Sequence, residues 1–193
     1  MTAVSAHPDD IAQEEILRAA LLLYQKFGPN KVTMDDVANA SGRSRTSLYY
    51  YYKNRDEIFL AVLDTIVNDI AKEIRQAVAN VGSLEDKIYA FCITKLKTSE
   101  DWKSILTVIV KSMETLHKKL LHAESVILNE ILTEAVRRKE MRELPPGEQD
   151  MLVFLVSTSI RGLRREILEL NDPHDLKAAL RLQTDILVKW LRK

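Results

Sequence analysis

The sequence predicts an all-α protein of about nine helices arranged in two domains. Apolar residues recur at spacings of three and four along the chain, whereas the alternating pattern of a half-buried strand is absent. Glycine and proline number only five each among the 193 residues, and they separate the apolar stretches. We expect a small helical domain over residues 1–54 and a larger one over residues 55–193.

The first helix is expected over residues 9–27, because Gly28 and Pro29 follow at once. Its core-facing stripe is predicted to contain Ile16, Ala20, Leu23 and Phe27.

Two short helices are expected next, joined by a tight turn. Thr33 and Asp36 have the spacing of a capping box, which predicts that a helix begins there and runs to residue 40. Gly42 is suited to close this helix, and Ser44 is suited to cap the one that follows and reaches residue 51 or 52.

Longer helices are expected over the rest of the chain. Asn54 with Glu57 predicts a helix that ends near residue 80. Further starts are predicted at Ser83 with Asp86, at Ser99 with Glu100 and Asp101, after Pro145 and Pro146, and at Asp172 with Pro173. A break is expected near residues 115–118, although no glycine or proline marks it. Residues 100–110 and 151–160 are apolar on more than one face, which is typical of buried or interface helices.

The two short helices have the arrangement of a helix-turn-helix motif. At about 100° per residue, Leu48 and Tyr52 lie on one side of the second helix, and Thr46 and Tyr50 lie nearly opposite. Tyr49 occupies one flank, and Ser47 with Tyr51 occupies the other. We therefore expect Leu48 and Tyr52 to pack inward and the outer face to be open to a partner.

Charge is concentrated in the same region. Lysine plus arginine and aspartate plus glutamate number 28 each, so the chain is formally neutral. Residues 43–55 nevertheless carry four cationic side chains and no acid, so this segment is +4 and the rest is −4. A basic aromatic tract by itself is more often a solvated surface, but one on a helix-turn-helix favours DNA binding.

Eleven residues are candidates for DNA contacts. Arg45, in the first turn of the second short helix, is suited to pair with guanine in the major groove. Arg55, at the start of the long helix, is suited to a phosphate, whereas Arg43 could instead cap the preceding helix. The full set is Thr33, Arg43, Ser44, Arg45, Thr46, Ser47, Tyr49, Tyr50, Tyr51, Lys53 and Arg55.

The N-terminal sixty residues also carry a longer pattern. It consists of Ile16, Ala19, Ala20, Leu23, Tyr24 and Gly28, then Thr33, Val37, Ala38, Gly42 and Ser44, and finally Leu48, Tyr49, Tyr52, Arg55, Ile58 and Phe59. This pattern resembles the tetracycline-repressor (TetR) family of bacterial transcription regulators. Four positions depart from it: Arg43 replaces a usual valine, Thr46 a glycine, Tyr51 a histidine and Arg55 a lysine. Tyr51 and Arg55 keep hydrogen-bond donors for phosphate. Arg43 and Thr46 alter the turn and the DNA-facing surface.

The resemblance implies a homodimeric repressor that binds a near-palindromic operator and responds to a small effector. An effector pocket is implied among Phe91, Trp102, Ile105, Ile109, Met113, His117 and Phe154, each of which also suits an ordinary core. The last two helices are expected to form the dimer. Leu176, Leu180, Leu187, Trp190 and Leu191 build an apolar stripe, and Ser159 and Gly162 are small enough to allow close approach.

Other functions fit the sequence less well. A DNA-binding regulator could instead be controlled by a protein partner through its C-terminal helices, without a small effector. An enzyme is not expected, because the sequence has neither a glycine-rich phosphate loop nor a convincing Ser-His-Asp arrangement. Glu114 and His117 have a di-iron spacing, but no second copy exists, so neither a metal nor another cofactor is expected.

A cytoplasmic location is expected, without membrane association. Cys92 is the single cysteine and its neighbours are apolar, which indicates a buried hydrophobe and a reducing compartment. The N-terminus lacks a secretory signal, and no run approaches the roughly 20 apolar residues that span a bilayer.

Overall fold

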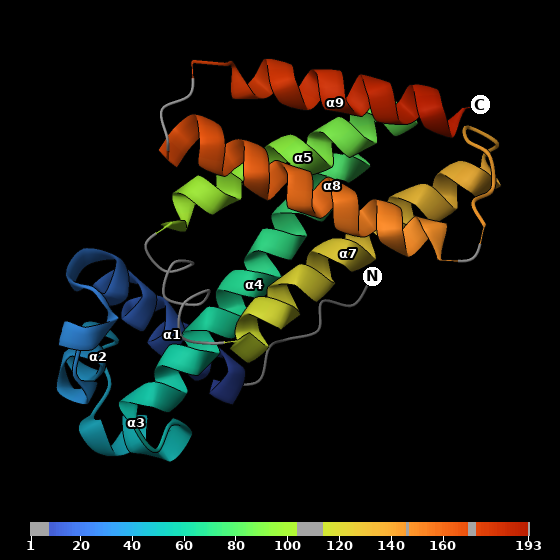
Figure 1. The fold of residues 1–193 in the computed structure, drawn as a ribbon. Coiled ribbons are helices and arrows are strands. Elements are labelled where there is room, and N and C mark those ends of the chain that lie inside the picture. The colour runs from blue at the N-terminus through green and yellow to red at the C-terminus, as the bar shows by residue number, and fades with distance from the viewer. Residues whose placement is uncertain (1–7, 104–113, 146, 170–172, 193) are drawn as a thin grey trace. The chain divides into compact units, whose positions relative to one another are not determined.

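The computed structural model describes residues 8–103, 114–145, 147–169 and 173–192 (Figure 1). Eight α-helices make up this part of the chain, with two short turns of other helix types and no β-strand among the described residues. The predicted all-α class is therefore confirmed. The chain divides into two compact units, Met1–Ile66 and Val67–Lys193, so the division falls inside a helix, later than the predicted boundary after residue 54.

The first unit contains three complete helices and the start of a fourth. They are α1 (Pro8–Phe27), α2 (Met34–Ala40), α3 (Arg45–Tyr51) and α4 (Arg55–Ala79), with the short 3₁₀ turn η1 (Pro29–Lys31) after α1. α1 packs on α2, and α2 packs on α3. The core side chains of α1–α4 include Ile16, Ala20, Tyr24, Val37, Leu48 and Ile58.

The predicted stripe on α1 is wrong at its C-terminal end. Phe27 is 48% exposed, whereas Tyr24 is almost fully buried. The ring of Tyr24 packs edge-on against Phe59 of α4, with the ring centres 5.3 Å apart. Ile16, Ala20 and Tyr24 follow one another at intervals of four, which keeps them on one helix face.

Side-chain caps set the starts of several helices as predicted. The Thr33 hydroxyl accepts from the Asp36 amide at 3.2 Å, and the Asp36 carboxylate accepts from the Thr33 amide at 2.8 Å. This reciprocal pair is a capping box. Ser44 caps α3, and Asn54 accepts from the Glu57 amide at 2.9 Å where α4 begins.

The second unit contains the rest of α4 and four further helices. They are α5 (Leu84–Asp101), α7 (Glu114–Arg137), α8 (Glu148–Arg164) and α9 (Leu176–Leu191), with the π-helical turn η2 (Arg165–Glu169) after α8. α5 packs on α7 and α9, and α8 packs on α7 and α9 (Figure 1). No described helix combines the length and apolar character needed to cross a bilayer.

Three predicted helix boundaries in this unit are wrong. Ser99 does not begin a helix; it lies inside α5, where its hydroxyl donates to the Lys95 carbonyl at 2.7 Å. A serine hydroxyl can satisfy either an amide at a helix start or the carbonyl four residues earlier, and the apolar face of α5 continues through Leu96. The predicted break at residues 115–118 is likewise absent, since α7 is continuous from Glu114.

The last helix begins later than Asp172 and Pro173 predict. Asp175 is the N-cap of α9, and its carboxylate accepts from the amides of Lys177 and Ala178 at 2.8 and 3.2 Å. Asp172 lies outside the described residues. Two aspartates three residues apart offer the same local signal, and the packing of Leu176 into the core favours the second.

Candidate nucleic-acid interface

The turn between α2 and α3 is tight because of Gly42. This glycine has φ +67°, a left-handed conformation that favours a residue without a side chain. The amide of Gly42 donates to the Asn39 carbonyl and the amide of Arg43 donates to the Ala38 carbonyl, so the carbonyls at the end of α2 are satisfied. Ser44 then accepts from the Ser47 amide at 3.1 Å and starts α3.

The faces of α3 are distributed as the helical periodicity predicts. Leu48 is fully buried, and Tyr52, at the C-cap, is half-buried, which raises the pKa of its phenol. Thr46 and Tyr50 point outward, and Tyr50 is 76% exposed. Tyr49 is also exposed. The outer face of α3 therefore presents hydroxyl groups and aromatic rings around a single buried anchor.

The three arginines of residues 43–55 have acidic or carbonyl partners that the charge count did not indicate. Arg43 Nη2 lies 2.6 Å from Glu15 Oε2 of α1. Arg45 Nε lies 3.2 Å from Asp35 Oδ1 of α2. Arg55 donates from Nη1 to the Asn30 carbonyl at 3.3 Å, and its Nη2 lies 3.5 Å from Asp56 Oδ1.

These partners separate Arg43 from the other predicted contacts. The half-buried Arg43 side chain links the turn to α1 and does not extend from the outer face of α3, whereas the Arg43 amide caps the end of α2. Arg45 and Arg55 are more exposed, at 64% and 43% of their side chains. Since exposed ion pairs contribute little stability, Arg55 can exchange its carboxylate for a DNA phosphate at small cost.

Three further candidates also have internal partners. The Tyr51 hydroxyl donates to Asp9 Oδ1 at 2.9 Å, and this hydrogen bond raises the pKa of Tyr51. The Thr33 hydroxyl donates to Asp36 Oδ2 at 2.7 Å, and the hydrogen bonds from Thr33 lower the pKa of Asp36. Lys53 is exposed, and its backbone amide donates to Glu57 Oε2 at 2.8 Å.

Residues 16–62 match the family described as "Bacterial regulatory proteins, tetR family", and this segment runs from α1 to the early part of α4. The helix-turn-helix segment of the chain therefore matches the TetR family, which confirms the predicted resemblance.

Two curated relatives illustrate the extent of the match. The HTH-type transcriptional regulator RutR of Escherichia coli strain K12 is 30% identical over 94 residues, which cover 47% of this chain and 42% of the relative. The HTH-type transcriptional regulator Rv1255c of Mycobacterium tuberculosis is 28% identical over 98 residues, which cover 51% and 48%. The chain thus spans about half the length of the curated relatives that it matches.

Solved structures are similar over nearly the whole chain. FadR of Bacillus subtilis, in complex with stearoyl-CoA, has a TM-score of 0.63 at 17% identity. The match covers 91% of this chain and 97% of the FadR chain. A TetR/AcrR-family regulator of Thermobifida fusca has a TM-score of 0.63 at 18% identity, covering 94% and 98%. At such identities the likeness concerns the fold.

The residues predicted for a TetR-type effector pocket lie in different settings. Phe91 is fully buried in α5, and Trp102 is half-buried at the end of the same helix. His117 of α7 is partly exposed, yet its Nδ1 is buried with no hydrogen-bond partner among the described residues. Phe154 is 59% exposed on α8, so it does not join Phe91 in the core. Ile105, Ile109 and Met113 lie outside the described residues.

The predicted dimer stripe on α9 needs correction. Leu176, Leu180 and Leu191 are buried within the unit, so they are unavailable to a partner. The exposed stripe of α9 instead contains Leu182, Ile186 and Trp190, at 61%, 61% and 43% exposure. Of the other candidates, Ser159 and Leu187 are half-buried and Gly162 is exposed. The sequence holds two apolar stripes on this helix, and their spacing alone does not show which one faces the core.

An apolar groove lies between α8 and α9. Its volume is about 730 Å³. The lining residues include Leu155, Ser159, Leu163, Leu182, Gln183, Ile186, Leu187 and Trp190. Gln183 Nε2 donates to Ser159 Oγ at 2.6 Å, which is a polar link between the two helices in apolar surroundings.

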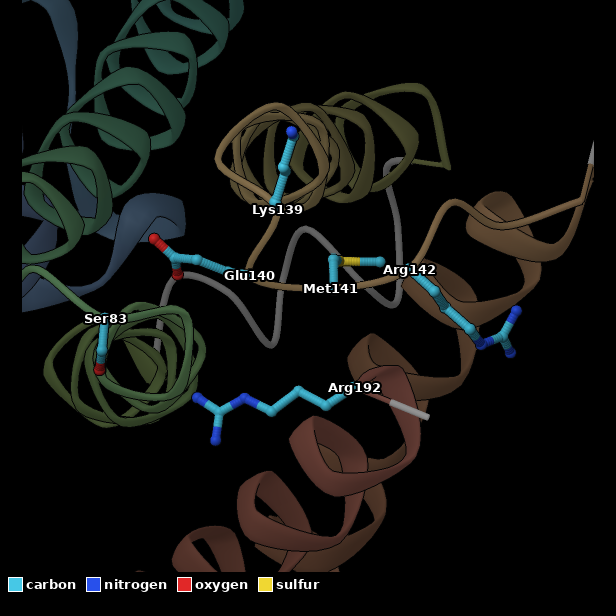
Figure 2. Close-up of a pocket in the computed structure, with 6 residues that line it drawn as sticks. All are labelled: Ser83, Lys139, Glu140, Met141, Arg142 and Arg192. Atoms are coloured by element: carbon cyan, nitrogen blue, oxygen red, sulfur yellow. The ribbon is translucent and has the colours of Figure 1, made fainter.

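A second hollow of about 680 Å³, near the C-terminal ends of α7 and α9, is polar (Figure 2). Its lining contains Lys139, Arg142 and Arg192, but these cations do not converge. Arg142 lies over the Trp190 ring at 4.5 Å, and in Figure 2 the Lys139 and Arg142 side chains point away from Arg192. This arrangement does not form a single anion site.

Proposed function

We propose that the chain is a sequence-specific DNA-binding transcriptional regulator that represses transcription as a homodimer on a near-palindromic operator. The observation that carries this proposal is the outer face of α3. Leu48 anchors the helix inside the unit, while Arg45, Thr46 and Tyr50 lie on the exposed side. A helix of this kind, preceded by a tight turn and a second short helix, enters the major groove in helix-turn-helix proteins.

Contacts to bases and contacts to phosphates fall to different residues. Four residues are proposed to contact base edges because they lie in the first turn or on the outer face of α3: Arg45, Thr46, Ser47 and Tyr50. Arg55, Lys53 and Tyr51 are proposed to contact phosphates, together with Thr33 at the start of α2. On binding, DNA phosphates would replace the present acidic partners of three of these residues. Arg55 would leave Asp56, Tyr51 would leave Asp9, and Thr33 would leave Asp36.

The homodimer is proposed to form through α8 and α9. Six large apolar side chains of these helices are exposed: Met151, Phe154, Leu155, Leu182, Ile186 and Trp190. An apolar surface of this kind typically marks a protein–protein interface. A two-fold axis through this surface would pack it against the same surface of a second subunit. Such a dimer would present two α3 helices to half-sites about 34–36 Å apart.

Ligand control is proposed through the interior of the second unit. The structurally similar FadR of B. subtilis binds stearoyl-CoA in its crystal structure, which supports the proposal that this fold can bind a small effector. Phe91, Trp102 and His117 are the described residues best placed to line such a site, because they lie in α5, at its C-cap and in α7. The effector must bind more tightly to the form that does not bind DNA, since only a difference in affinity shifts the equilibrium.

Selection of bound sequences from random duplex DNA tests the central proposal. The intact chain should enrich a near-palindrome whose half-sites are about one helical turn apart. Repression is then tested by placing the enriched sequence in a reporter promoter and expressing the chain. A chain that enriches no sequence, or only a single half-site, would contradict the proposed dimeric operator binding.

A further inference from the structure

Arg45 is the one arginine of residues 43–55 that is held from two sides by residues of the helix-turn-helix itself. Its Nε lies 3.2 Å from Asp35 Oδ1, in the first turn of α2. Its Cζ lies 5.8 Å from the centre of the Tyr49 ring, one turn further along α3. Tyr49 and the charge of Asp35 both raise the pKa of Arg45.

The atoms that these partners occupy distinguish Arg45 from its neighbours. Arg43 uses Nη2 for Glu15, and Arg55 uses both Nη groups, for Asn30 and Asp56. The shortest contact of the Arg45–Asp35 ion pair is made by Nε. Guanine accepts two hydrogen bonds from one arginine, at O6 and N7, and the Nη groups are suitable donors.

We propose that Asp35 is a positioning residue for base recognition, which acts by holding Arg45 for a guanine in the operator half-site. An arginine side chain has many rotamers, and an ion pair at Nε with an aromatic ring alongside restricts them before DNA arrives. The inference rests on the proposed function, because it requires that α3 contact bases.

The charge of Asp35 has a second consequence. A carboxylate at the DNA-facing end of α2 repels phosphates, so it weakens binding to every sequence. The lost affinity is regained only where Arg45 finds its base. Asp35 therefore increases the ratio of specific to non-specific binding, which is a form of specificity obtained from a repulsive element.

The alternative is an ordinary surface ion pair. The Asp35 and Arg45 side chains are 58% and 64% exposed, and such pairs contribute little to stability. Removal of the Asp35 charge should therefore leave the fold intact under either interpretation. DNA binding can then be compared between variants of equal stability.

The experiment uses the intact chain, the operator that it selects, and the Asp35→Asn substitution. Affinity is measured for the operator, for operators changed at each base pair, and for random duplex DNA, at two salt concentrations. We expect D35N to bind random DNA more tightly. Arg45→Ala should lose the preference for one base pair of the operator. At that base pair, D35N should reduce the ratio of affinities for the preferred and changed base by roughly tenfold. The double variant should lose no more there than Arg45→Ala alone.

Asp56→Asn is the matched control. It also removes an exposed carboxylate beside an arginine, but Arg55 is proposed to contact a phosphate. It should raise affinity for all sequences and leave base preference unchanged. Asp35→Glu, which keeps the charge, should restore part of the discrimination that D35N loses.

The outcomes separate the two proposals. A wild-type chain that enriches no sequence overturns the proposed function. An enriched operator whose base preferences are the same for wild type, D35N and D56N overturns only the role of Asp35. Weaker binding of D35N to all DNA also overturns it, provided that circular dichroism and thermal unfolding match the wild type.

Discussion

The outer face of α3 and the outer face of α9 are both exposed, but their chemistry is opposite. α3 presents Thr46 and Tyr50, whose hydroxyl groups can bind phosphates or base edges. α9 presents Leu182 and Ile186, each 61% exposed and without a polar atom in the side chain. The first surface is suited to a polar, charged partner and the second to another apolar surface.

The two helices also differ in how far their own residues determine which face is buried. α3 has seven residues and a single buried side chain, Leu48, so its inner and outer faces follow from that one position. α9 has sixteen residues and two apolar stripes, so its faces depend on what packs against it. An exposed stripe can be removed without harm to the unit, whereas a buried stripe cannot.

The largest expected effect is at the exposed stripe of α9. Ile186→Glu would place an unpaired carboxylate in the proposed dimer interface, which costs roughly 3 kcal/mol or more, or about a hundredfold in dissociation constant. Sedimentation at several concentrations should show monomers, and operator affinity should fall with the dimer. Lys177→Glu, on an exposed part of the same helix, is the control and should remain dimeric. Dimeric Ile186→Glu would contradict the assignment of this stripe.

The buried stripe of the same helix should respond in the opposite way. Leu180 is fully buried, so Leu180→Ala should destabilise the second unit by about 2–5 kcal/mol through lost burial and a cavity. Chemical denaturation measures the loss. At temperatures where the chain is folded, the dimer dissociation constant should stay near that of the wild type, because Leu180 does not reach the surface.

On α3 and the start of α4, two arginine substitutions should separate base contacts from phosphate contacts. Arg45→Ala should lower operator affinity by about 1–3 kcal/mol more than it lowers affinity for random DNA. Arg55→Ala should weaken binding to both, and the slope of log K against log salt should decrease by about 0.9. Titrations on operator and random duplex at several salt concentrations measure these effects. A sequence-selective loss for Arg55→Ala would show that it contacts a base.

The helix caps should give smaller effects in each unit. Asp175→Ala removes the cap of α9 and should lower the free energy of unfolding by about 1 kcal/mol. Asp172→Ala should have a smaller effect, because Asp175 already accepts from the first amides of the helix. Thermal unfolding of the two variants distinguishes them, and a larger loss for Asp172→Ala would place the helix start where the sequence predicts it.

The smallest expected effect is a pH dependence at the start of α2. Hydrogen bonds from Thr33 lower the pKa of Asp36 in the folded chain. This carboxylate therefore contributes stability above the pKa it has when unfolded, and the contribution is lost as pH falls through the lowered folded value. Asp36→Asn should be less stable than wild type at neutral pH, and the difference in melting temperature should shrink in acid. A difference that is independent of pH would contradict this account of the capping box.

Local signals in the sequence were sufficient for most helices and for the orientation of α3. Thr33 with Asp36 and Ser44 with Gly42 define the short helices, because caps and left-handed glycines act within four residues of chain. The same local logic failed at Ser99, whose hydroxyl had two possible partners, and at Asp172, because Asp175 offers the same capping signal. Tertiary packing determined which of them was adopted.

The partners of the basic residues could not be predicted in the same way. Glu15, Asp35 and Asp9 lie outside residues 43–55, and their distances to Arg43, Arg45 and Tyr51 depend on how α1, α2 and α3 pack together. A charge count along the chain treats the three arginines as free, whereas in the folded unit each has an acidic neighbour.

By itself, the sequence determined the helical class, the helix-turn-helix and the outward side of α3, since each of these follows from spacing and caps within a few residues. Only the tertiary structure decided which stripe of α9 is buried and which carboxylate lies beside Arg45. The physical reason is that burial and ion pairing are relations between segments distant in the chain, whereas helix periodicity is a property of neighbouring residues.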